Sequence, residues 1–352
     1  ATKSGKTTLA EAMLYEGKVI DRRGTVEDKN TVSDNTEIEK MNQRSIYASP
    51  LYAEFMDKKI NILDAPGSDD FIGGAYAGLS VCECGILVIN AQQGVEVGTE
   101  NILRIAQARK LPLIIAANQL DAEKSDWDNF QNSLKESLGG KFINIQFPVN
   151  AGPSFDSFVD VLTMKMYRFK DDKGTREDLE IPADLADQAE LYRNELIEKA
   201  AEYDDALMEK FFAEGTLTED EIRKGLSIGV ANGDVYPVFC ASGKKDIGVK
   251  RILEFTKNVA PAPKCKADGP ASLFIYKSAV EPHLGEVSFF KVMSGSIIAG
   301  MDLEDPATGN KERLSAIYAV AGTKKEAVNV LHAGDFGCAV KLKNGKSSTT
   351  LA

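Results

Sequence analysis

The stretch Ser4-Gly5-Lys6-Thr7-Thr8, close to the start of the sequence, decides how the rest of the chain is interpreted. It matches the second half of the phosphate-binding pattern G-x-x-x-x-G-K-[ST]. In that loop, backbone N–H groups surround the phosphates, a lysine reaches their outer oxygens and a hydroxyl contacts Mg²⁺. The first glycine of the pattern would precede Ala1, so we expect the first strand of the fold to lie before this sequence. Ser-Gly-Lys runs also occur in ordinary loops, so further motifs are needed.

Length and composition indicate a water-soluble protein of two or three domains. The chain has 352 residues, of which 43% are hydrophobic and 27% are charged, values typical of globular proteins. No apolar run is long enough to span a membrane, and no secretory leader opens the sequence. The five cysteines are odd in number and scattered, which favours unpaired thiols in a reducing cytoplasm. We interpret the close pair Cys82 and Cys84 as thiols packed on a helix.

The negative charge is concentrated in one segment. The net charge is -11, and residues 170–224 contain 18 Asp/Glu and 8 Lys/Arg, a balance of -10. The rest of the chain is therefore close to neutral, and overall acidity does not exclude a nucleic-acid partner. Most of these acidic residues are expected to lie on a solvated helical face.

Strands and helices alternate in the first part of the chain. Residues 8–16 have helical spacing, 51–55 and 59–63 form a hairpin pattern, and 85–90 and 113–117 are short apolar runs typical of buried parallel strands. Helices are expected at 99–110, 125–138 and 249–259, and a buried strand at 236–241. This alternation predicts a doubly wound α/β fold, with ligand loops at the carboxyl ends of the strands.

Two other regions differ from this pattern. Residues 150–236 are rich in charged helical segments, with expected helices at 181–202, 204–212 and 218–225, and read as a helical/β subdomain inserted within residues 1–260. Residues 261–267 contain a Pro-Ala-Pro linker, and 268–352 carry β-patterned runs at 272–280, 286–293, 311–320 and 335–342. We therefore expect a β-barrel as the last domain. The polar stretch 21–45 is expected to be a mobile loop, a nucleotide-ordered switch, or both.

Three further loops follow strands at the places where a nucleotide site would need them. Asp64-Ala65-Pro66-Gly67 fits D-x-x-G, in which the carboxylate supports Mg²⁺ through water and the glycine lets the backbone approach a γ-phosphate. Asn118-Gln119-Leu120-Asp121 resembles N-K-x-D, where a carboxylate accepts from N1 and N2 of guanine and the asparagine ties its loop to the phosphate loop. Ser242 and Gly243 follow a strand where a loop would close over the base. The order of the four motifs predicts a guanine-nucleotide site.

With these motifs, the chain resembles the first two domains of elongation factor G, a translational GTPase. The likeness extends to Leu14–Lys18, Gly94–Glu100, Pro237–Val249 and Ala333–Asp335. The resemblance implies binding of GTP, GDP and Mg²⁺, with Ser4, Gly5, Lys6, Thr7, Thr8, Asp64, Gly67, Asn118, Gln119, Asp121, Ser242 and Gly243 at the nucleotide and Thr7 and Asp64 near the metal. It also implies a monomer that contacts ribosomal RNA through the barrel and the ribosomal stalk protein through the insertion. The family's C-terminal half is not represented, so the chain resembles a fragment.

The departures from the family pattern concern catalysis. Tyr47 stands where the family has a threonine that orders Mg²⁺ and the γ-phosphate, and a phenol reaches too far to replace a short hydroxyl. Ser68 stands where the family has a histidine that positions the attacking water. Loss of one such group commonly costs a factor of about 10² to 10³ in rate. No confident catalytic residue is left, and hydrolysis is expected to be weak or lost.

Two more departures affect nucleotide binding. Gln119 replaces the lysine of N-K-x-D, which removes a cation but leaves guanine selectivity with Asp121. Lys3 stands where the family usually has an aspartate beside the phosphates. We hypothesise that its ammonium group substitutes there for a monovalent cation; the alternative is a solvated lysine. A strong potassium requirement for GTP binding would count against the substitution.

These features predict a cytoplasmic, ribosome-associated GTP-binding elongation factor with weak hydrolysis. One alternative is an active ribosome-dependent GTPase of the ribosome-protection or release type, in which another residue replaces the missing histidine. A more remote alternative is a small-molecule kinase using ATP, which would give no reason for Asn118, Asp121 or the barrel.

Overall fold

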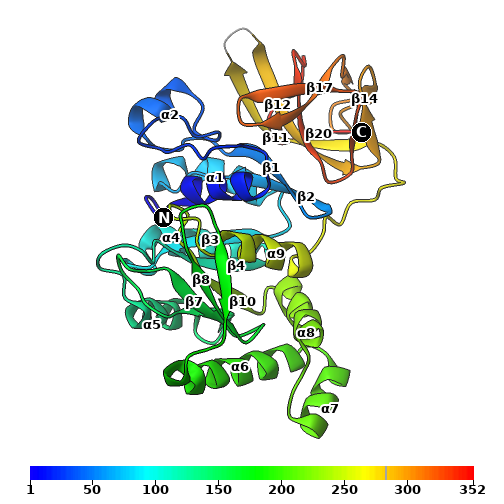
Figure 1. Ribbon diagram of the computed structural model, residues 1–352. Coiled ribbons are helices and arrows are strands. Elements are labelled where there is room, and N and C mark those ends of the chain that lie inside the picture. Colours follow the sequence, from blue (N-terminus) through cyan, green and yellow to red (C-terminus); the bar gives the residue numbers. More distant parts are fainter. Residues whose placement is uncertain (282–283) are drawn as a thin grey trace.

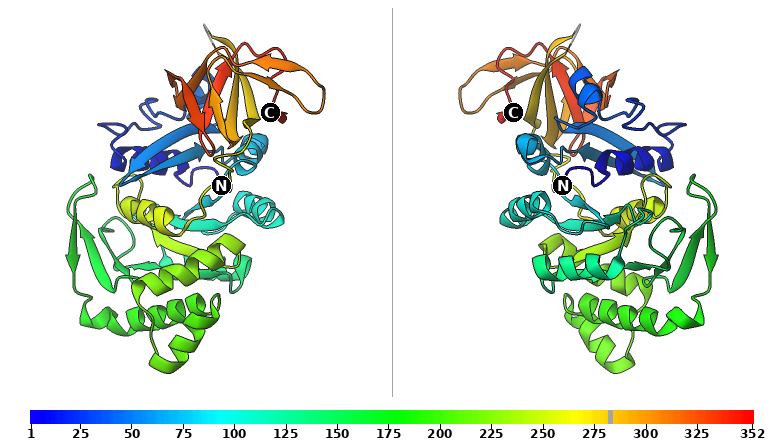
Figure 2. Two further views of the ribbon diagram at one scale, coloured as in Figure 1. Left: turned by 90° about the vertical axis from the view of Figure 1, so that its right-hand side faces the viewer. Right: turned by 90° about the vertical axis from the view of Figure 1, so that its left-hand side faces the viewer.

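The computed structural model describes residues 1–281 and 284–352. His283, one of two histidines in the sequence and not expected to be catalytic, lies outside the described residues. An α/β unit occupies the first part of the chain, and a β-rich unit follows the extended segment after residue 260 (Figure 1). The views in Figure 2 place the β-rich unit on the side of the α/β unit opposite to the inserted helices α6–α8. In the described part of the chain, no helix is both long and apolar enough to cross a membrane.

The centre of the α/β unit is a four-stranded parallel sheet in the order β3-β4-β10-β5. Its strands are β3 (Gly85–Asn90), β4 (Leu113–Asn118), β10 (Tyr236–Cys240) and β5 (Phe142–Asn144). Strand β4 is buried along its whole length, as expected for a strand covered on both faces. The helices of this unit are α1 (Lys6–Glu16), α3 (Ile72–Leu79), α4 (Val97–Ala108), α5 (Trp127–Leu138) and α9 (Val249–Val259). The predicted doubly wound fold is confirmed.

A hairpin and a long lobe precede this sheet. Strands β1 (Ser49–Phe55) and β2 (Lys58–Asp64) pair antiparallel, and β2 ends at Asp64. The preceding residues form a lobe that contains α2 (Glu37–Asn42). Thr36 caps this helix in a capping box with Glu39, a T-x-x-E signal that the sequence analysis missed. The sequence predicts a mobile loop, a nucleotide-ordered switch, or both for this stretch; the lobe contains a short helix, and its role as a switch stays a prediction.

The insertion lies between β5 and β10. Strands β6 (Gln146–Pro148), β7 (Ser157–Asp160), β8 (Lys165–Phe169) and β9 (Arg176–Leu179) form an antiparallel sheet. Helices α6 (Ala186–Ala201), α7 (Asp205–Glu214) and α8 (Glu219–Asn232) follow. Helix α8 runs further than the expected end at residue 225 because Gly225 and Gly229 are buried helical positions packed against residues 200 and 203.

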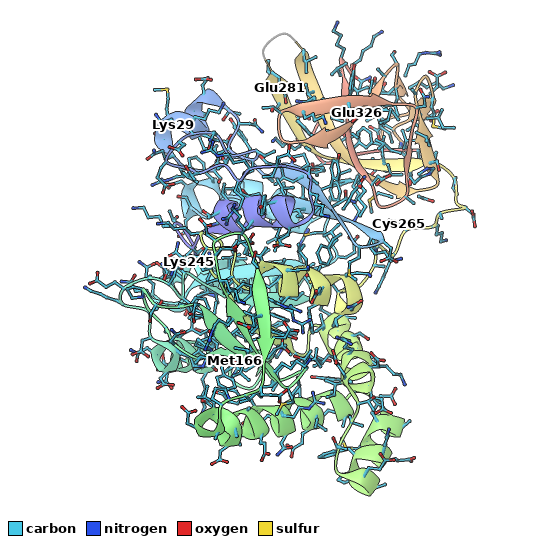
Figure 3. All side chains as sticks on the ribbon, viewed as in Figure 1. Lys29, Met166, Lys245, Cys265, Glu281 and Glu326 are labelled. Atoms are coloured by element: carbon cyan, nitrogen blue, oxygen red, sulfur yellow. The ribbon has the colours of Figure 1, made fainter. Side chains whose placement is uncertain are left out.

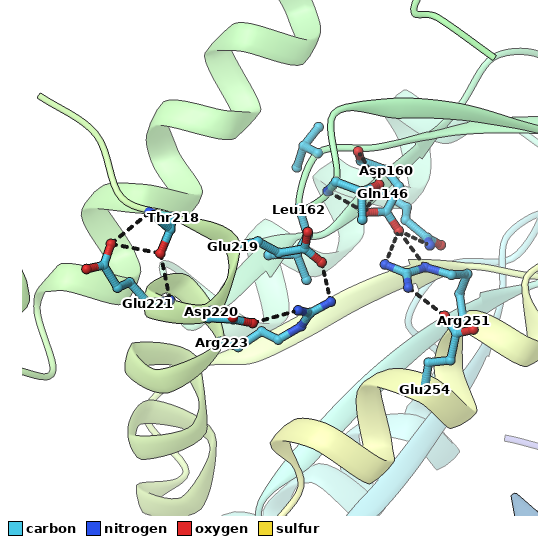
Figure 4. A network of polar contacts seen from close by, with 12 residues as sticks. Gln146, Asp160, Leu162, Thr218, Glu219, Asp220, Glu221, Arg223, Arg251 and Glu254 are labelled. Carbon is cyan, nitrogen blue, oxygen red and sulfur yellow. Dashed lines mark hydrogen bonds and ion pairs between the residues drawn. The ribbon is translucent and has the colours of Figure 1, made fainter. Parts of the chain in front are cut away.

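A buried ion pair joins strand β7 of the insertion to helix α9 (Figure 4). Asp160, which is fully buried on β7, accepts hydrogen bonds from Nε and Nη2 of Arg251 on α9, each at 3.0 Å. The same oxygen accepts from Gln146 Nε2 at 2.8 Å, and Gln146 Oε1 accepts from the backbone N–H of Cys240 at 3.1 Å. Each member has a partner, the condition under which a buried charge is tolerated.

The β-rich unit confirms the predicted barrel class, with more strands than expected. Its main sheet has the order β17-β16-β19-β12-β11-β20. These strands are β11 (Ser272–Glu281), β12 (Gly285–Ser294), β16 (Ile317–Ala321), β17 (Lys324–Val328), β19 (Phe336–Val340) and β20 (Thr349–Leu351). Two short antiparallel pairs lie outside the main sheet: β13 (Ser296–Ile298) pairs with β18 (Val330–His332), and β14 (Asp302–Glu304) pairs with β15 (Lys311–Arg313). The expected strand 311–320 is wrong as one element: it divides into β15 and β16.

Cys82 and Cys84 are not part of a helix, although the Cys82 thiol contacts the last turn of α3, in partial agreement with the predicted packing on a helix. Both lie in the loop between α3 and β3 and are partly buried. The Cys82 thiol donates to the Gly78 carbonyl at 3.1 Å. Burial raises the pKa of Cys82 to about 11, so the thiol stays protonated and unreactive near neutral pH.

Candidate nucleotide-binding site

The loop before α1 has the backbone conformation of a phosphate-binding turn. Gly5 adopts φ +82° immediately before the first residue of the helix, a left-handed conformation that favours glycine. A Cβ atom at Gly5 would lie 2.4 Å from Nδ2 of Asn118, so close packing also excludes a side chain. The first turn of α1 leaves backbone N–H groups unpaired, which suits an anion.

Asn118 joins three loops at one point. Its Nδ2 donates to the Ser4 carbonyl at 2.9 Å, and its Oδ1 accepts from the backbone N–H of Gly243 at 3.0 Å. Both atoms are at the end of β4, where the parallel sheet places its ligand loops. The expected link between the Asn118 loop and the phosphate loop is thus present, and it extends to the loop after β10.

Gln119 has a structural role that the sequence analysis did not foresee. Its Nε2 donates to the Lys3 carbonyl at 3.1 Å, while its Oε1 accepts from Asn90 Nδ2 at 2.7 Å. A lysine at this position could donate a hydrogen bond but could not accept one. The amide of Gln119 does both, and it thereby connects Asn90 at the end of β3 with the phosphate loop. The Lys3 side chain is exposed, and its proposed exchange with a monovalent cation remains a prediction.

Asp121 lies in the loop after β4, and its contact with a guanine base stays a prediction. It follows Leu120, whose N–H donates to the Ala241 carbonyl at 3.4 Å, so the two base-side loops are adjacent. Among the described residues its carboxylate has no hydrogen bond or ion pair, and it is partly exposed. Ser242 is fully buried and its Oγ accepts from the N–H of Lys245 at 3.2 Å, which shapes the second loop. Figure 3 labels Lys245 beside this region.

Lys6 and Gly67 lie against each other. The Lys6 ammonium donates to the Ala1 carbonyl at 2.7 Å, and a Cβ at Gly67 would lie 2.1 Å from its Nζ. Only glycine therefore allows the turn after Asp64 to approach this lysine. Burial lowers the pKa of Lys6, and the nearby Asp64 carboxylate opposes that effect. A partly buried ammonium with one carbonyl partner is well suited to receive phosphate oxygens.

Thr7 and Asp64 meet as the metal hypothesis requires. Thr7 Oγ1 donates to Asp64 Oδ2 at 2.8 Å, and Ser33 Oγ donates to the same oxygen at 2.7 Å. Thr7 Oγ1 also lies 3.1 Å from Ser45 Oγ. Burial raises the pKa of Asp64, and the hydrogen bonds from Ser33 and Thr7 act against this rise.

Ser33, Asp34 and Ser45 were not identified from the sequence. They lie in the polar stretch 21–45, which contains many hydroxyl and carboxylate residues without a spacing rule that would select three of them. Asp34 is buried beside Ser45, and burial raises the pKa of its carboxyl group to about 6. Only the folding of the lobe over Asp64 brings these groups to the site.

The residues present fit Mg²⁺. Thr7, Ser33, Ser45 and Asp64 supply oxygen atoms only, the donor type that this ion prefers. In the described ranges no group of three or more His, Cys, Asp or Glu residues forms a metal cage. Mg²⁺ normally uses one or two protein carboxylates and completes its shell with phosphate oxygens and water, which agrees with Asp64 and the neighbouring Asp34 at this point.

Tyr47 does not face this cluster. Its ring lies over the ammonium of Lys277 on β11, 5.2 Å from Nζ to the ring centroid, and 44% of the residue is exposed. Glu39 holds the backbone by accepting from the N–H groups of Ile46 and Tyr47 at 3.0 and 3.1 Å. Ser45, two residues earlier, supplies the hydroxyl nearest to Thr7.

Ser68 follows Gly67 at the end of the D-x-x-G turn. Its Oγ donates to Asp70 Oδ2 at 3.4 Å and its carbonyl accepts from Phe71 N–H at 3.0 Å. The side chain therefore supports the short turn Asp69–Phe71. His332 is in the barrel and pairs with Ser296 at 3.0 Å, so it offers no imidazole to this site.

The phosphate loop, the buried Thr7–Asp64 pair and the Asn118 and Ser242 loops define a P-loop nucleotide-binding protein. Residues 2–262 match the family model described as elongation factor Tu GTP binding domain, and residues 270–351 match elongation factor G domain 2. The chain therefore belongs to the elongation-factor family of translational GTPases. A family defined by GTP binding argues against the small-molecule kinase alternative.

A solved structure supports the same conclusion. The chain is similar to the protein ttk003000868 from Thermus thermophilus, with a TM-score of 0.90 and 29% sequence identity over 99% of this chain. The match covers 52% of that protein, so the present chain spans about half of its length. Together with the two family models, which cover residues 2–262 and 270–351, this match confirms the predicted likeness to the elongation-factor family over nearly the whole chain.

Proposed function

We propose that the chain binds GTP with Mg²⁺ as part of a ribosome-associated, elongation factor G-like translation factor and that it hydrolyses GTP weakly. The order of the loops around Lys6, Asp64 and Gly67, and not rapid turnover, would then transmit the nucleotide state. The domain division 1–260, 261–267 and 268–352, with the insertion at 150–236, is part of this proposal. So are a monomeric state, a cytoplasmic location, and contacts with ribosomal RNA and the stalk protein.

Ser68 carries the proposal of weak hydrolysis. The hydroxyl is short, is uncharged near neutral pH, and is already engaged with Asp70 at 3.4 Å. It can neither accept a proton from water as an imidazole does nor stabilise charge in the transition state. Since phosphoryl transfer depends on positioning and electrostatics, the loss of this group leaves little catalysis of the attack.

The replacement of the family threonine by Tyr47 is a weaker argument for slow hydrolysis than the sequence alone suggests. Its ring is directed to Lys277, while the Ser33 and Ser45 hydroxyls lie with Thr7 and Asp64. These hydroxyls supply short oxygen ligands of the kind that the missing threonine would give. We therefore assign the weak hydrolysis mainly to Ser68 and expect Mg²⁺ binding to be retained.

Single-turnover GTP hydrolysis by the full-length protein, with and without ribosomes, tests the proposal. We expect GTP binding in both cases and a rate that ribosomes raise far less than for an ordinary elongation factor. Stimulation comparable to an ordinary factor would support the alternative of an active ribosome-dependent GTPase of the protection or release type.

A further inference from the structure

A second cavity lies between the α/β unit and the barrel, away from the phosphate loop. It has a volume of about 590 Å³. Its walls come from the residues after α1, the lobe that contains α2, strand β1, and the turn between β16 and β17. In Figures 1 and 3 the lobe, which carries the labelled Lys29, and the barrel, which carries Glu326, lie on the same side of α1. We call this space the interdomain cavity.

Positive charge is concentrated in the interdomain cavity. Lys18, Lys40 and Lys324 all line it, and within residues 1–281 and 284–352 none of the three forms an ion pair. Glu54 is the carboxylate on the same wall, so three ammonium groups face one negative charge. In a protein of net charge -11, these three lysines come from separate elements of the fold and share one cavity with a single carboxylate. They attract an anion with more than one negative charge.

A buried hydroxyl also lacks a partner there. Thr31 lines the interdomain cavity, is only 6% exposed, and its Oγ1 has no hydrogen-bond partner in the described chain. Buried polar atoms almost always have a partner, so an orphaned one indicates a ligand or bound water. The hydroxyl is therefore available to a ligand in the lysine-lined space.

The remaining wall is apolar. Val19, Val32 and Tyr52 line the interdomain cavity together with the polar groups. A volume near 590 Å³ lies within the range of small-molecule sites that combine an apolar wall with a few polar anchors. We propose that the interdomain cavity is a second ligand site for a nucleoside polyphosphate, with phosphates on the three lysines and the ring system against the apolar wall.

The site would be coupled to the phosphate loop through the chain itself. Thr31 and Val32 directly precede Ser33, whose hydroxyl donates to Asp64 at 2.7 Å. From the barrel side, Gly322 (φ +59°) is packed so closely that a Cβ there would lie 2.2 Å from the Val32 carbonyl oxygen. A ligand bound at Thr31 would therefore act on a segment that continues directly into Ser33. Such coupling is reciprocal: each nucleotide changes the affinity for the other by the same factor.

Isothermal titration tests the second site on the full protein saturated with GDP and Mg²⁺, so that the phosphate loop is already occupied. The titrants are ATP and inorganic tripolyphosphate. We expect one further molecule per chain, with ATP bound more tightly than tripolyphosphate because the ring adds apolar contacts. The triple variant Lys18→Gln/Lys40→Gln/Lys324→Gln should bind at least about tenfold more weakly, and Thr31→Val should weaken binding to a smaller degree.

The matched control is Lys135→Gln/Lys165→Gln/Lys311→Gln, which removes the same charge from three exposed lysines elsewhere. Equal weakening in both triple variants would overturn the proposal, because it would show an effect of net charge only. Absence of a second binding event, or competition by RNA without any nucleotide binding, would also overturn it. GDP binding to each variant is measured separately, so a failure at the phosphate loop is distinguished from a failure at the second site. Thermal denaturation checks that the variants fold.

Discussion

Ser68 makes the sharpest prediction for a single residue. In Ser68→His, an imidazole at the end of the Asp64–Gly67 turn can position water, so GTP hydrolysis should rise by up to about 10² to 10³ in the presence of ribosomes. Single-turnover hydrolysis gives the rate, and Ser68→Ala should match the wild type. Because the Tyr47 ring lies on Lys277, adding Tyr47→Thr should give little further gain. A variant Ser68→His as slow as the wild type would contradict our assignment.

Asp121 should determine which base is bound. Its carboxylate has no protein partner among the described residues, so it can accept two hydrogen bonds from guanine. Removal of the carboxylate removes both of these charge-assisted hydrogen bonds. Asp121→Ala should therefore weaken GTP binding by about 10- to 100-fold and leave the weak binding of ATP to the phosphate loop unchanged. Titration calorimetry measures both affinities. Glu123→Ala, an exposed carboxylate two residues away, is the control, and an equal loss in both variants would refute the role of Asp121.

Asp246 predicts a pH dependence of stability. It is 1% exposed, both of its carboxylate oxygens lack a hydrogen-bond partner in the described chain, and burial raises its pKa to about 7, with Glu16 contributing. A carboxyl group whose pKa is raised on folding stabilises the folded state at low pH and loses that contribution as pH rises through 7. Asp246→Asn should thus stabilise the protein at pH 8 and much less at pH 5, as measured by urea unfolding. The same gain at both pH values would contradict this account.

At the scale of elements, the Asp160–Arg251 pair holds the insertion against α9. Arg251 is 7% exposed and Asp160 is fully buried, so Arg251→Met would leave a buried carboxylate uncompensated and should cost about 3–5 kcal/mol in the free energy of unfolding. Glu254→Gln removes only a flanking partner and should cost about 1 kcal/mol. Chemical denaturation measures both values. If Arg251→Met cost no more than Glu254→Gln, the pair would not be the main polar link of the insertion.

Apolar periodicity in the sequence predicts some helices and strands correctly and others not. The expected helix at 249–259 agrees with α9, and the expected strand at 85–90 agrees with β3, because a dense apolar pattern identifies both. The expected strand 311–320 instead divided into two, since a break near Leu314 turns the chain between two sheets. Short strands such as β13 and β18 have three residues each, too few to show an alternation.

At the scale of the whole molecule, Lys291 links the barrel to the α/β unit. This lysine of β12 is 1% exposed, donates to the Val81 carbonyl at 2.6 Å and contacts Glu83 in the loop before β3. Lys291→Met should remove these contacts while keeping most of the apolar stem, so the two units should unfold in separate steps. Calorimetry should show one thermal transition for the wild type and for the exposed barrel control Lys341→Met, and two for Lys291→Met. A single transition in Lys291→Met would show that other contacts carry the coupling.

The sequence by itself determined the fold class and the four nucleotide motifs, because both depend on local patterns: apolar spacing, turn residues, and glycines where a backbone must approach closely. It also showed that Ser68 stands in place of a histidine. Tertiary structure decided what the lobe 21–48 does. Hydroxyls from Ser33 and Ser45 reach Thr7 and Asp64, and the Tyr47 ring turns to Lys277, only when the lobe is folded between β2 and the barrel. Contacts between residues far apart in the chain depend on how its elements pack, which no local pattern records.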